Sequence, residues 1–179
     1  MNKSIHQAPA TRRQIVTGIA ATMAALAAGS RAGAHAKAPE VTEKPADPAH
    51  AALTALHYDI DFKASPQRFC QAIMDAKQFA AFSGMPAEID AKPGGAFTLF
   101  GGMIVGRTIE LVENERIVQA WRPTHWDGGV YSLIHFELKP RGGEMTLAFD
   151  HTGFPAGDYD SLDEGWHIHY WEPLRKSLV

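Results

Sequence analysis

Cysteine is scarce in this sequence: Cys70 is the only one among 179 residues, which excludes an internal disulfide framework and a zinc ribbon. We interpret Cys70 as a small buried residue of a helix. A phosphate-binding glycine loop, a dinucleotide fingerprint and a Ser-His-Asp elbow are also missing, so we expect no cofactor. The remaining composition, 45% hydrophobic and 21% charged, excludes collagen, coiled coil and wholesale disorder. The length suits one domain with a sizeable core.

Acidic residues are missing from the first 36 residues, which hold four cations at Lys3, Arg12, Arg13 and Arg31. The remaining 143 residues hold the other 13 cations and all 20 acids, so their net charge is −7. A domain this acidic is a poor candidate for binding nucleic acid or an anionic membrane, and we expect neither as a partner.

A long hydrophobic run is missing as well. The apolar stretch Ile19–Ala28 is too short for a membrane span of about 20 residues. It follows the pair Arg12 and Arg13 and precedes the small-residue signal formed by Ala34 and Ala36, an order typical of a cleavable export signal. The paired arginines resemble the twin-arginine type. We therefore predict that residues 1–36 engage the twin-arginine export machinery and that the mature protein is periplasmic; the alternative is an ordinary amphipathic N-terminal helix.

The next segment, residues 37–52, is polar, contains Pro39, Pro45 and Pro48, and has no apolar period. We interpret it as a flexible linker. A regulatory or docking role is the alternative, although no specific feature supports it. The ordered domain is predicted to cover residues 53–179.

Regular alternation of apolar and polar residues over 56–62 predicts a half-buried strand. Ser65 and Pro66 then form a typical helix start, and two short helices end before Gly84. Five strands follow, at about 96–100, 103–113, 116–122, 129–139 and 144–152. From about residue 160 a terminal helix carries one apolar stripe, which Pro173 should kink or shorten; the stripe consists of Trp166, Tyr170, Leu174 and Leu178. This order describes an α+β fold.

One hairpin can be placed by register. If Pro140 pairs with Gly143, then six apolar side chains of the two strands share one face, and Ser132 lies opposite His151 on the inward side. A slip by one residue would move every side chain to the other face.

The order and spacing of several motifs resemble the C-terminal-type domain of the activator of the ninety-kilodalton heat-shock-protein ATPase, over about residues 55–179. This family belongs to the SRPBCC, or START-like, helix-grip superfamily. The motifs are Lys92-Pro93-Gly94-Gly95-Ala96-Phe97, Gly106, Ile109–Leu111, Arg116–Val118, Trp121-Arg122, Phe136–Leu138, Leu147–Phe154 and Gly165-Trp166. The resemblance implies a curved antiparallel sheet of about six or seven strands wrapped round a C-terminal helix, with two short helices after the first strand. Phe82, where many relatives carry tryptophan, and Pro173 depart from the family pattern.

The resemblance also implies a cavity between sheet and helix. Strand parity and the helical stripe indicate which residues face inward. Most of these residues are apolar and a few are polar, a combination typical of small-molecule sites; they are Phe82, Phe97, Leu99, Ile109, Leu111, Ile117, Gln119, Trp121, Ile134, Phe136, Leu147, Phe149, His151, Trp166 and Tyr170. An ordinary packed core has the same character, and for most of these residues we favour that interpretation.

His151 is the residue of this set that is the candidate for ligand binding or proton transfer. A neutral imidazole could orient a ligand or act as a general base. The structural alternative, which we prefer, is a histidine hydrogen-bonded to Ser132, Tyr170 or a backbone carbonyl. We expect no metal site, because His167 and His169 are two apart on a helix and point to different sides.

Three functions remain open. The first is an exported protein that binds a small hydrophobic molecule in the cavity. The second is an interaction module that acts on a partner protein, in the manner of a co-chaperone. The third is a cavity enzyme that uses His151 for proton transfer. A fold does not by itself define a function. The resemblance to the superfamily implies ligand binding more often than catalysis, and the predicted export would separate the protein from cytosolic chaperones and from ATP. We therefore lean towards the first function and away from catalysis.

Overall fold

The computed structural model describes residues 47–179, so the predicted export signal and the first part of the predicted linker lie outside the described residues. Along the chain the elements are β1 (Ala55–Phe62), α1 (Pro66–Met74), α2 (Ala76–Ser83), β2 (Glu88–Ile89), β3 (Ala96–Leu99), the 3₁₀ turn η1 (Phe100–Gly102), β4 (Ile104–Val112), β5 (Arg116–Pro123), β6 (Ser132–Arg141), β7 (Glu144–Thr152), α3 (Tyr159–Trp166), the π-helical segment η2 (His167–Trp171) and α4 (Glu172–Ser177). No helix within residues 47–179 is long and apolar enough to cross a membrane.

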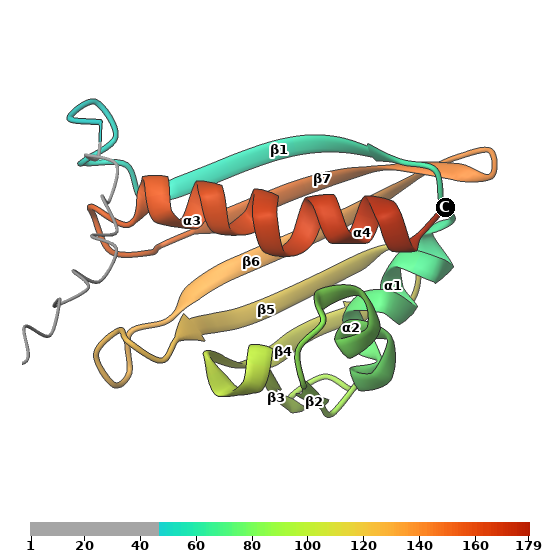
Figure 1. Ribbon diagram of the computed structural model, residues 1–179, viewed down its shortest axis with the longest axis horizontal. Helices are drawn as coiled ribbons and strands as arrows, with labels where there is room; N and C mark the ends of the chain where they lie inside the picture. The colour runs from blue at the N-terminus through green and yellow to red at the C-terminus, as the bar shows by residue number, and fades with distance from the viewer. Residues whose placement is uncertain (1–46) are drawn as a thin grey trace, which may run out of the picture. The chain divides into compact units, whose positions relative to one another are not determined.

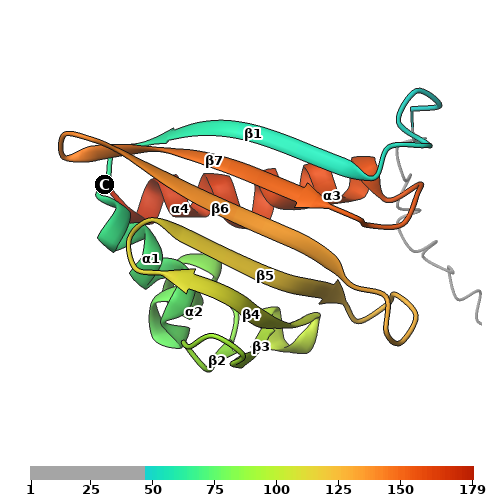
Figure 2. The same ribbon diagram turned by 180° about the vertical axis from the view of Figure 1, so that it is seen from behind.

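The seven strands form one antiparallel sheet in the order β1-β7-β6-β5-β4-β3-β2. The sheet curves round the terminal helix formed by α3, η2 and α4, and α1 and α2 lie on the same side (Figure 1). Seen from behind, the opposite face of the sheet carries none of the helices of residues 47–179 (Figure 2). The predicted α+β helix-grip architecture is therefore confirmed, with the two-residue β2 as an addition.

The first of the two short helices begins, and the second ends, at the residue expected to cap it. The Ser65 hydroxyl accepts a hydrogen bond from the backbone N–H of Arg68, and Pro66 occupies the first turn of α1. Helix α2 ends at Gly84, whose φ of 70° is a left-handed conformation that glycine adopts without a steric cost. Cys70 is buried in α1, as expected of a small apolar residue.

The space between sheet and helices is filled by large side chains. The most completely buried of these share an apolar or aromatic character; they are Trp171, Phe62, Phe69, Phe79, Phe136, Phe149, Phe154, Ile117, Ile134, Met145, Leu147 and Leu174. Such close packing leaves little room for a guest molecule in the middle of the fold.

The terminal helix departs from α-helical geometry just before Pro173. The Glu172 N–H bonds to the His167 carbonyl, five residues earlier, so one extra residue fits into the turn. As a result Tyr170 and its neighbour Trp171 both face the core, with exposures of 5% and 1%. The break expected at Pro173 thus takes the form of a π segment, and Trp171 joins the stripe that the sequence predicted.

The register of the β6–β7 hairpin differs from the prediction. Arg141 pairs with Glu144, and the pairs continue through Phe136 with Phe149, so the turn is Gly142-Gly143 and the register is shifted by two residues. Because two is a full period of a strand, every predicted side chain still lies on its predicted face.

Ile109 was predicted to face inward, and this is wrong. The pairing of β4 with β5 shifts between Thr108 and Glu110, where β4 contains a bulge. Thr108 is therefore completely buried, whereas Ile109 is 50% exposed on the outer surface.

The last residues of the predicted linker contact the domain. The Asp47 backbone N–H donates to the Asp160 carboxylate at 2.8 Å, and His50 Nδ1 lies 2.6 Å from the other oxygen of the same carboxylate. The His50 ring also packs against Tyr159, with 4.5 Å between ring centroids. Residues 47–52 are thus attached to the start of α3.

Candidate functional site

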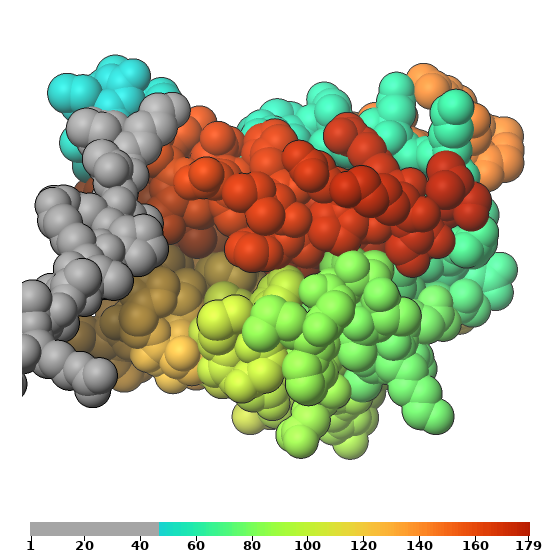
Figure 3. Space-filling view, viewed as in Figure 1, coloured from blue at the N-terminus to red at the C-terminus, as the bar shows by residue number. Residues whose placement is uncertain are grey.

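An apolar cleft of about 240 Å³ opens beside the terminal helix, between that helix and the strand ends that face it. Its walls come from three separate parts of the chain and are mostly aromatic or aliphatic; they are Phe100, Met103, Ile104, Trp121, Pro123, His125, Ser161, Leu162, Gly165, Trp166, His169 and Tyr170. Figure 3 shows the seam between the orange-red terminal helix and the yellow-green η1 region, where two of these parts meet.

Local geometry positions each wall. Phe100 has a φ of 52°, an uncommon conformation for a bulky residue, and its ring packs on Tyr170 with 5.3 Å between centroids. On the helical wall, Gly165 has no side chain, and no heavy atom lies within 4 Å of the position a Cβ would take. The cleft therefore exists partly because residue 165 is a glycine.

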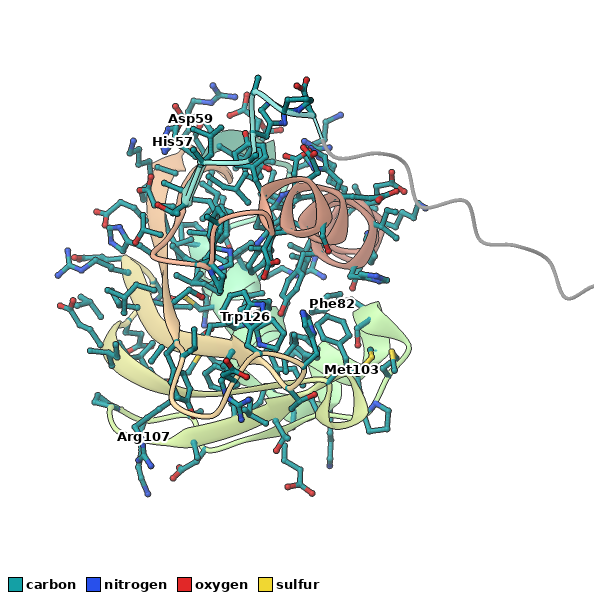
Figure 4. The ribbon with its side chains drawn as sticks, turned by 90° about the vertical axis from the view of Figure 1, so that its left-hand side faces the viewer. His57, Asp59, Phe82, Met103, Arg107 and Trp126 are labelled. Carbon is teal, nitrogen blue, oxygen red and sulfur yellow. The ribbon has the colours of Figure 1, made fainter. Side chains whose placement is uncertain are left out.

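The side chains labelled in Figure 4 show what lies inside and outside this region. Trp126 lies between the terminal helix and the sheet, with Met103 and Phe82 below the helix in this view. His57 and Arg107 point away from it, on the outer surface of the sheet. Trp126 is held by a hydrogen bond from its indole N–H to the Asp158 carboxylate.

Three of the predicted cavity residues, Trp121, Trp166 and Tyr170, line the cleft. Ten other members of the predicted set are buried in the packed core and do not line the cleft: Phe82, Phe97, Leu99, Ile117, Gln119, Ile134, Phe136, Leu147, Phe149 and His151. Leu111 is partly buried against this core, and Ile109 is exposed. Whether any of them serves a ligand stays a prediction. Phe100, Met103 and His125 also line the cleft but were not among the predicted cavity residues. Phe100 and Met103 were placed at the ends of two predicted strands, and His125 lies between two strands, so strand parity did not point to them.

His151 is fully buried, and hydrogen bonds satisfy both of its ring nitrogens. The Trp166 indole N–H donates to Nδ1 at 3.0 Å, and Nε2 lies 2.7 Å from the Ser132 hydroxyl. Because an indole is only a donor, Nδ1 carries no proton and Nε2–H donates to Ser132. Ser132 in turn donates to the Trp121 carbonyl at 3.0 Å. This chain joins helix α3 to strands β5, β6 and β7.

Burial lowers the pKa of His151 to about 3, because the charged imidazolium would be taken out of water. Its two partners, a serine and a tryptophan, carry no charge. The imidazole is thus neutral and inaccessible, and it has no free nitrogen to offer a substrate. This arrangement favours the structural interpretation of His151 over the general-base one.

Trp121 and Tyr170, two of the predicted residues that line the cleft, each carry a polar group. The Trp121 indole N–H is itself buried and has no hydrogen-bond partner among the described residues. Burial raises the pKa of the Tyr170 phenol, and the Trp121 side chain opposes the rise.

A larger hollow of about 480 Å³ lies elsewhere, on the outer face around the β6–β7 hairpin. Its walls include Asp59, Asp61 and Arg141, whose side chains are each more than 60% exposed. An open, charged hollow of this kind encloses little of a ligand, so we regard it as surface relief.

No group of three or more potential metal ligands lies together within residues 47–179. The two histidines of the helix separate as expected. His167 bonds through Nδ1 to the Asp163 carbonyl at 2.8 Å, whereas His169 lines the cleft beside Phe100.

Comparison with known proteins gives consistent matches. The family described as activator of Hsp90 ATPase homolog 1-like protein matches residues 63–178. An uncharacterised protein of Schizosaccharomyces pombe is 32% identical over 114 residues, which is 64% of this chain and 34% of that protein. Activator of 90 kDa heat shock protein ATPase homolog 1 of Homo sapiens is 28% identical over 117 residues, 65% of this chain and 35% of that protein.

Among solved structures, an HSP90 activator from Plasmodium falciparum matches with a TM-score of 0.66 at 24% identity. The match covers 69% of this chain and 94% of that one, and it shows a common fold. The chain spans about a third of the length of the curated relatives it matches.

Proposed function

Since the chain belongs to the activator of Hsp90 ATPase homolog 1-like family, we propose that its helix-grip domain binds a small, largely apolar molecule in the cleft beside the terminal helix. The observation that carries this proposal is the cleft itself, whose lining is mostly aromatic or aliphatic and includes a few polar side chains, among them His125, Ser161 and His169. Such a combination is typical of small-molecule sites. At about 240 Å³ the cleft suits a small molecule of about two or three rings.

Gly165 offers a direct test. Gly165→Leu places a side chain in the empty space of the cleft without meeting any atom near its Cβ. Gly165→Ala is the matched control, because a single methyl group leaves the cleft open and improves helix propensity by about 0.5–1 kcal/mol.

The measurement is a fluorescence titration of N-phenyl-1-naphthylamine, with folding checked by circular dichroism. We expect the wild type and Gly165→Ala to bind the dye and Gly165→Leu to bind it at least about tenfold more weakly, a loss of about 1.4 kcal/mol. Failure of the dye to bind the folded wild type, or equal binding by all three proteins, would contradict the proposal.

A second candidate is interaction with a partner protein. The core is filled, and near the start of β6 three apolar side chains, Val130, Tyr131 and Leu133, are 37–47% exposed. The human relative is an activator of the ATPase of the 90 kDa heat-shock protein, as its name states. In this case the protein would stimulate that ATPase in a purified system. Leu133→Asp would weaken the stimulation, and Gly165→Leu would leave it unchanged.

We also propose that the first 36 residues direct export to the periplasm through the twin-arginine machinery. The support is the pair Arg12 and Arg13, the apolar run and the small-residue signal ending at Ala36. Arg12→Lys with Arg13→Lys should leave the precursor at full length in the cytoplasm, because an ammonium does not reproduce guanidinium geometry. Cell fractionation and the mass of the product measure the outcome, and accumulation of the double mutant in the periplasm would contradict it.

A further inference from the structure

The histidines of the folded protein differ in whether their rings have a polar partner. Five of the seven histidines within residues 47–179 have a hydrogen bond or an ion pair; they are His50, His57, His135, His151 and His167. The rings of His125 and His169 have neither to any residue of this range, and their contacts are with aromatic rings. These two are also the two histidines that line the cleft.

The cleft has a polar mouth and an apolar floor. Three wall residues are exposed and carry polar side chains; they are His125, Ser161 and His169. The aromatic wall residues are buried instead, with exposures of 5% or less; they are Phe100, Trp121, Trp166 and Tyr170. A molecule in the cleft therefore has aromatic rings against one end and two open imidazoles near the other.

The turn η1 positions both histidines, although they are 44 residues apart in the chain. The His169 ring lies against the Phe100 ring, with 5.9 Å between centroids. The neighbour of His125, Thr124, donates from its backbone N–H and its hydroxyl to the Met103 carbonyl, at 2.8 and 3.1 Å. Because Phe100 and Met103 flank the same short turn, the two imidazoles lie at the same side of the cleft.

Charged residues of the neighbouring segments stay off the walls of the cleft; they are Arg122, Asp127, Asp158, Asp160, Asp163, Glu164, Glu172 and Arg175. Several of them are already engaged: Asp158 accepts from the Trp126 indole, Asp160 pairs with His50, Asp163 accepts from the Tyr58 hydroxyl, and Arg122 donates to the Trp126 carbonyl. Asp127, Glu164 and Glu172 are exposed, where water screens their charges. Among the wall residues, the two histidines are thus the groups able to become cationic in mild acid.

We propose that the cleft binds an aromatic carboxylic acid, whose ring system packs on the buried aromatic walls and whose carboxylate is held at the mouth by His125 and His169. A neutral imidazole donates one N–H, whereas a protonated one donates two and adds a positive charge. Hydrogen bonds between such charged groups are about twice as strong as neutral ones. This inference rests on the proposed binding of a small molecule in the same cleft.

Two ligands of nearly the same shape test the carboxylate. 2-Naphthoate and 2-naphthamide differ in charge and share the ring system, and both can be measured by displacement of N-phenyl-1-naphthylamine from the full chain. At about pH 5.5, with folding checked by circular dichroism, we expect the carboxylate to bind about tenfold more tightly than the amide.

The pH dependence gives a second readout. The affinity for 2-naphthoate should rise about tenfold from about pH 7.5 to about pH 5.5, because imidazoles gain protons in this range while a carboxyl group stays ionised. The affinity for 2-naphthamide should change by less than about twofold, because the amide carries no charge in this range.

The double variant His125→Gln with His169→Gln removes both ionisable rings and keeps polar side chains with N–H groups. It should abolish the preference for the carboxylate and leave 2-naphthamide binding unchanged. His167→Gln is the matched control, because this exposed histidine is on the same helical segment but outside the cleft.

Nuclear magnetic resonance of the imidazole Cε1–H groups identifies the histidines directly. Adding 2-naphthoate at about pH 6.5 should shift the signals of His125 and His169 towards their protonated positions. The signal of His57, which points away from the cleft on the outer surface of the sheet (Figure 4), should stay in place.

The outcomes separate the two proposals. If the dye binds but 2-naphthoate binds no better than 2-naphthamide at about pH 5.5, or if the double variant keeps the preference, the carboxylate inference is overturned and the binding site stands. A preference that disappears in EDTA would also overturn it, because a metal ion would then hold the carboxylate. If neither the dye nor either ligand binds the folded protein, both proposals fail.

Discussion

Mild acid should destabilise this protein through His151, and replacing His151 by Phe should remove that effect. In the folded state Nδ1 accepts from Trp166, so a second proton on the ring would break this hydrogen bond inside a dry environment. Burial accordingly lowers the pKa of His151 from 6.5 to about 3. In the unfolded chain the same imidazole titrates at its ordinary value.

The sign follows from the protons bound by each state. Between about pH 6.5 and about pH 3 the unfolded chain holds a proton on His151 that the folded chain does not, so stability falls as the pH falls. Each pH unit in this window is worth about 1.4 kcal/mol, so the loss from about pH 7.5 to about pH 5 is about 2 kcal/mol. At neutral pH, His151→Phe leaves the Trp166 N–H without an acceptor and costs about 1–3 kcal/mol. The two stability curves therefore converge near pH 5.

The assay is urea denaturation followed by tryptophan fluorescence at several pH values between these limits. His57→Gln is the control, because the hydrogen bond that His57 Nδ1–H donates to the Asp150 carboxylate raises the pKa of His57. A group whose pKa is raised in the folded state adds stability below its unfolded-state pKa, and this stability is lost as the pH rises. The difference in free energy of unfolding between the wild type and His57→Gln should therefore grow as the pH falls, which is opposite to the trend for His151. If His151→Phe loses as much stability as the wild type between about pH 7.5 and about pH 5, the assignment of the proton linkage to His151 is refuted.

Two further changes test the packing. Gly106→Ala places a Cβ 2.2 Å from the Phe97 ring and 2.3 Å from the Ala120 carbonyl oxygen, and should cost about 2–3 kcal/mol by thermal unfolding. Gly143→Ala meets no atom within 4 Å, so an equal loss there would contradict the steric reason. Trp166→Ala should lower the free energy of unfolding, measured by urea denaturation, by about 3–5 kcal/mol, because it leaves a cavity between helix and sheet. A loss under about 1 kcal/mol would contradict this, since it would show that neighbouring side chains move in and fill the cavity.

Strand positions and faces could be predicted from the sequence because alternation has a period of two residues. The same period explains what could not be predicted: a shift of the β6–β7 hairpin by two residues changes no face, so parity does not distinguish a turn at Arg141-Gly142 from one at Gly142-Gly143. The bulge at Thr108 and Ile109 was missed for a related reason. It adds one residue to a strand that carries apolar residues on both faces, so no alternation was there to be broken.

The hydrogen bond between His151 and Ser132 is one of the three alternatives that the sequence left open for this histidine. The prediction that the two residues lie directly opposite each other is wrong, because His151 pairs with Ile134. The cleft was not anticipated in its true place. It forms where Phe100, His125 and Gly165 come together from three segments far apart in the chain, and its volume depends on the missing side chain of Gly165. Hydrophobic patterning reports which side of an element is buried, but not how closely two buried sides approach.

The extra residue in the π segment offsets the second half of the terminal helix from the first by about one residue, which is about 100° of rotation in an α-helix. The first half, α3, packs on β1 and supplies Leu162 and Gly165 to the cleft, whereas the second half, α4, packs on α2. Because of this offset the two halves do not share one α-helical stripe: Gly165 lies on the cleft wall, while Leu174 is fully buried in the core.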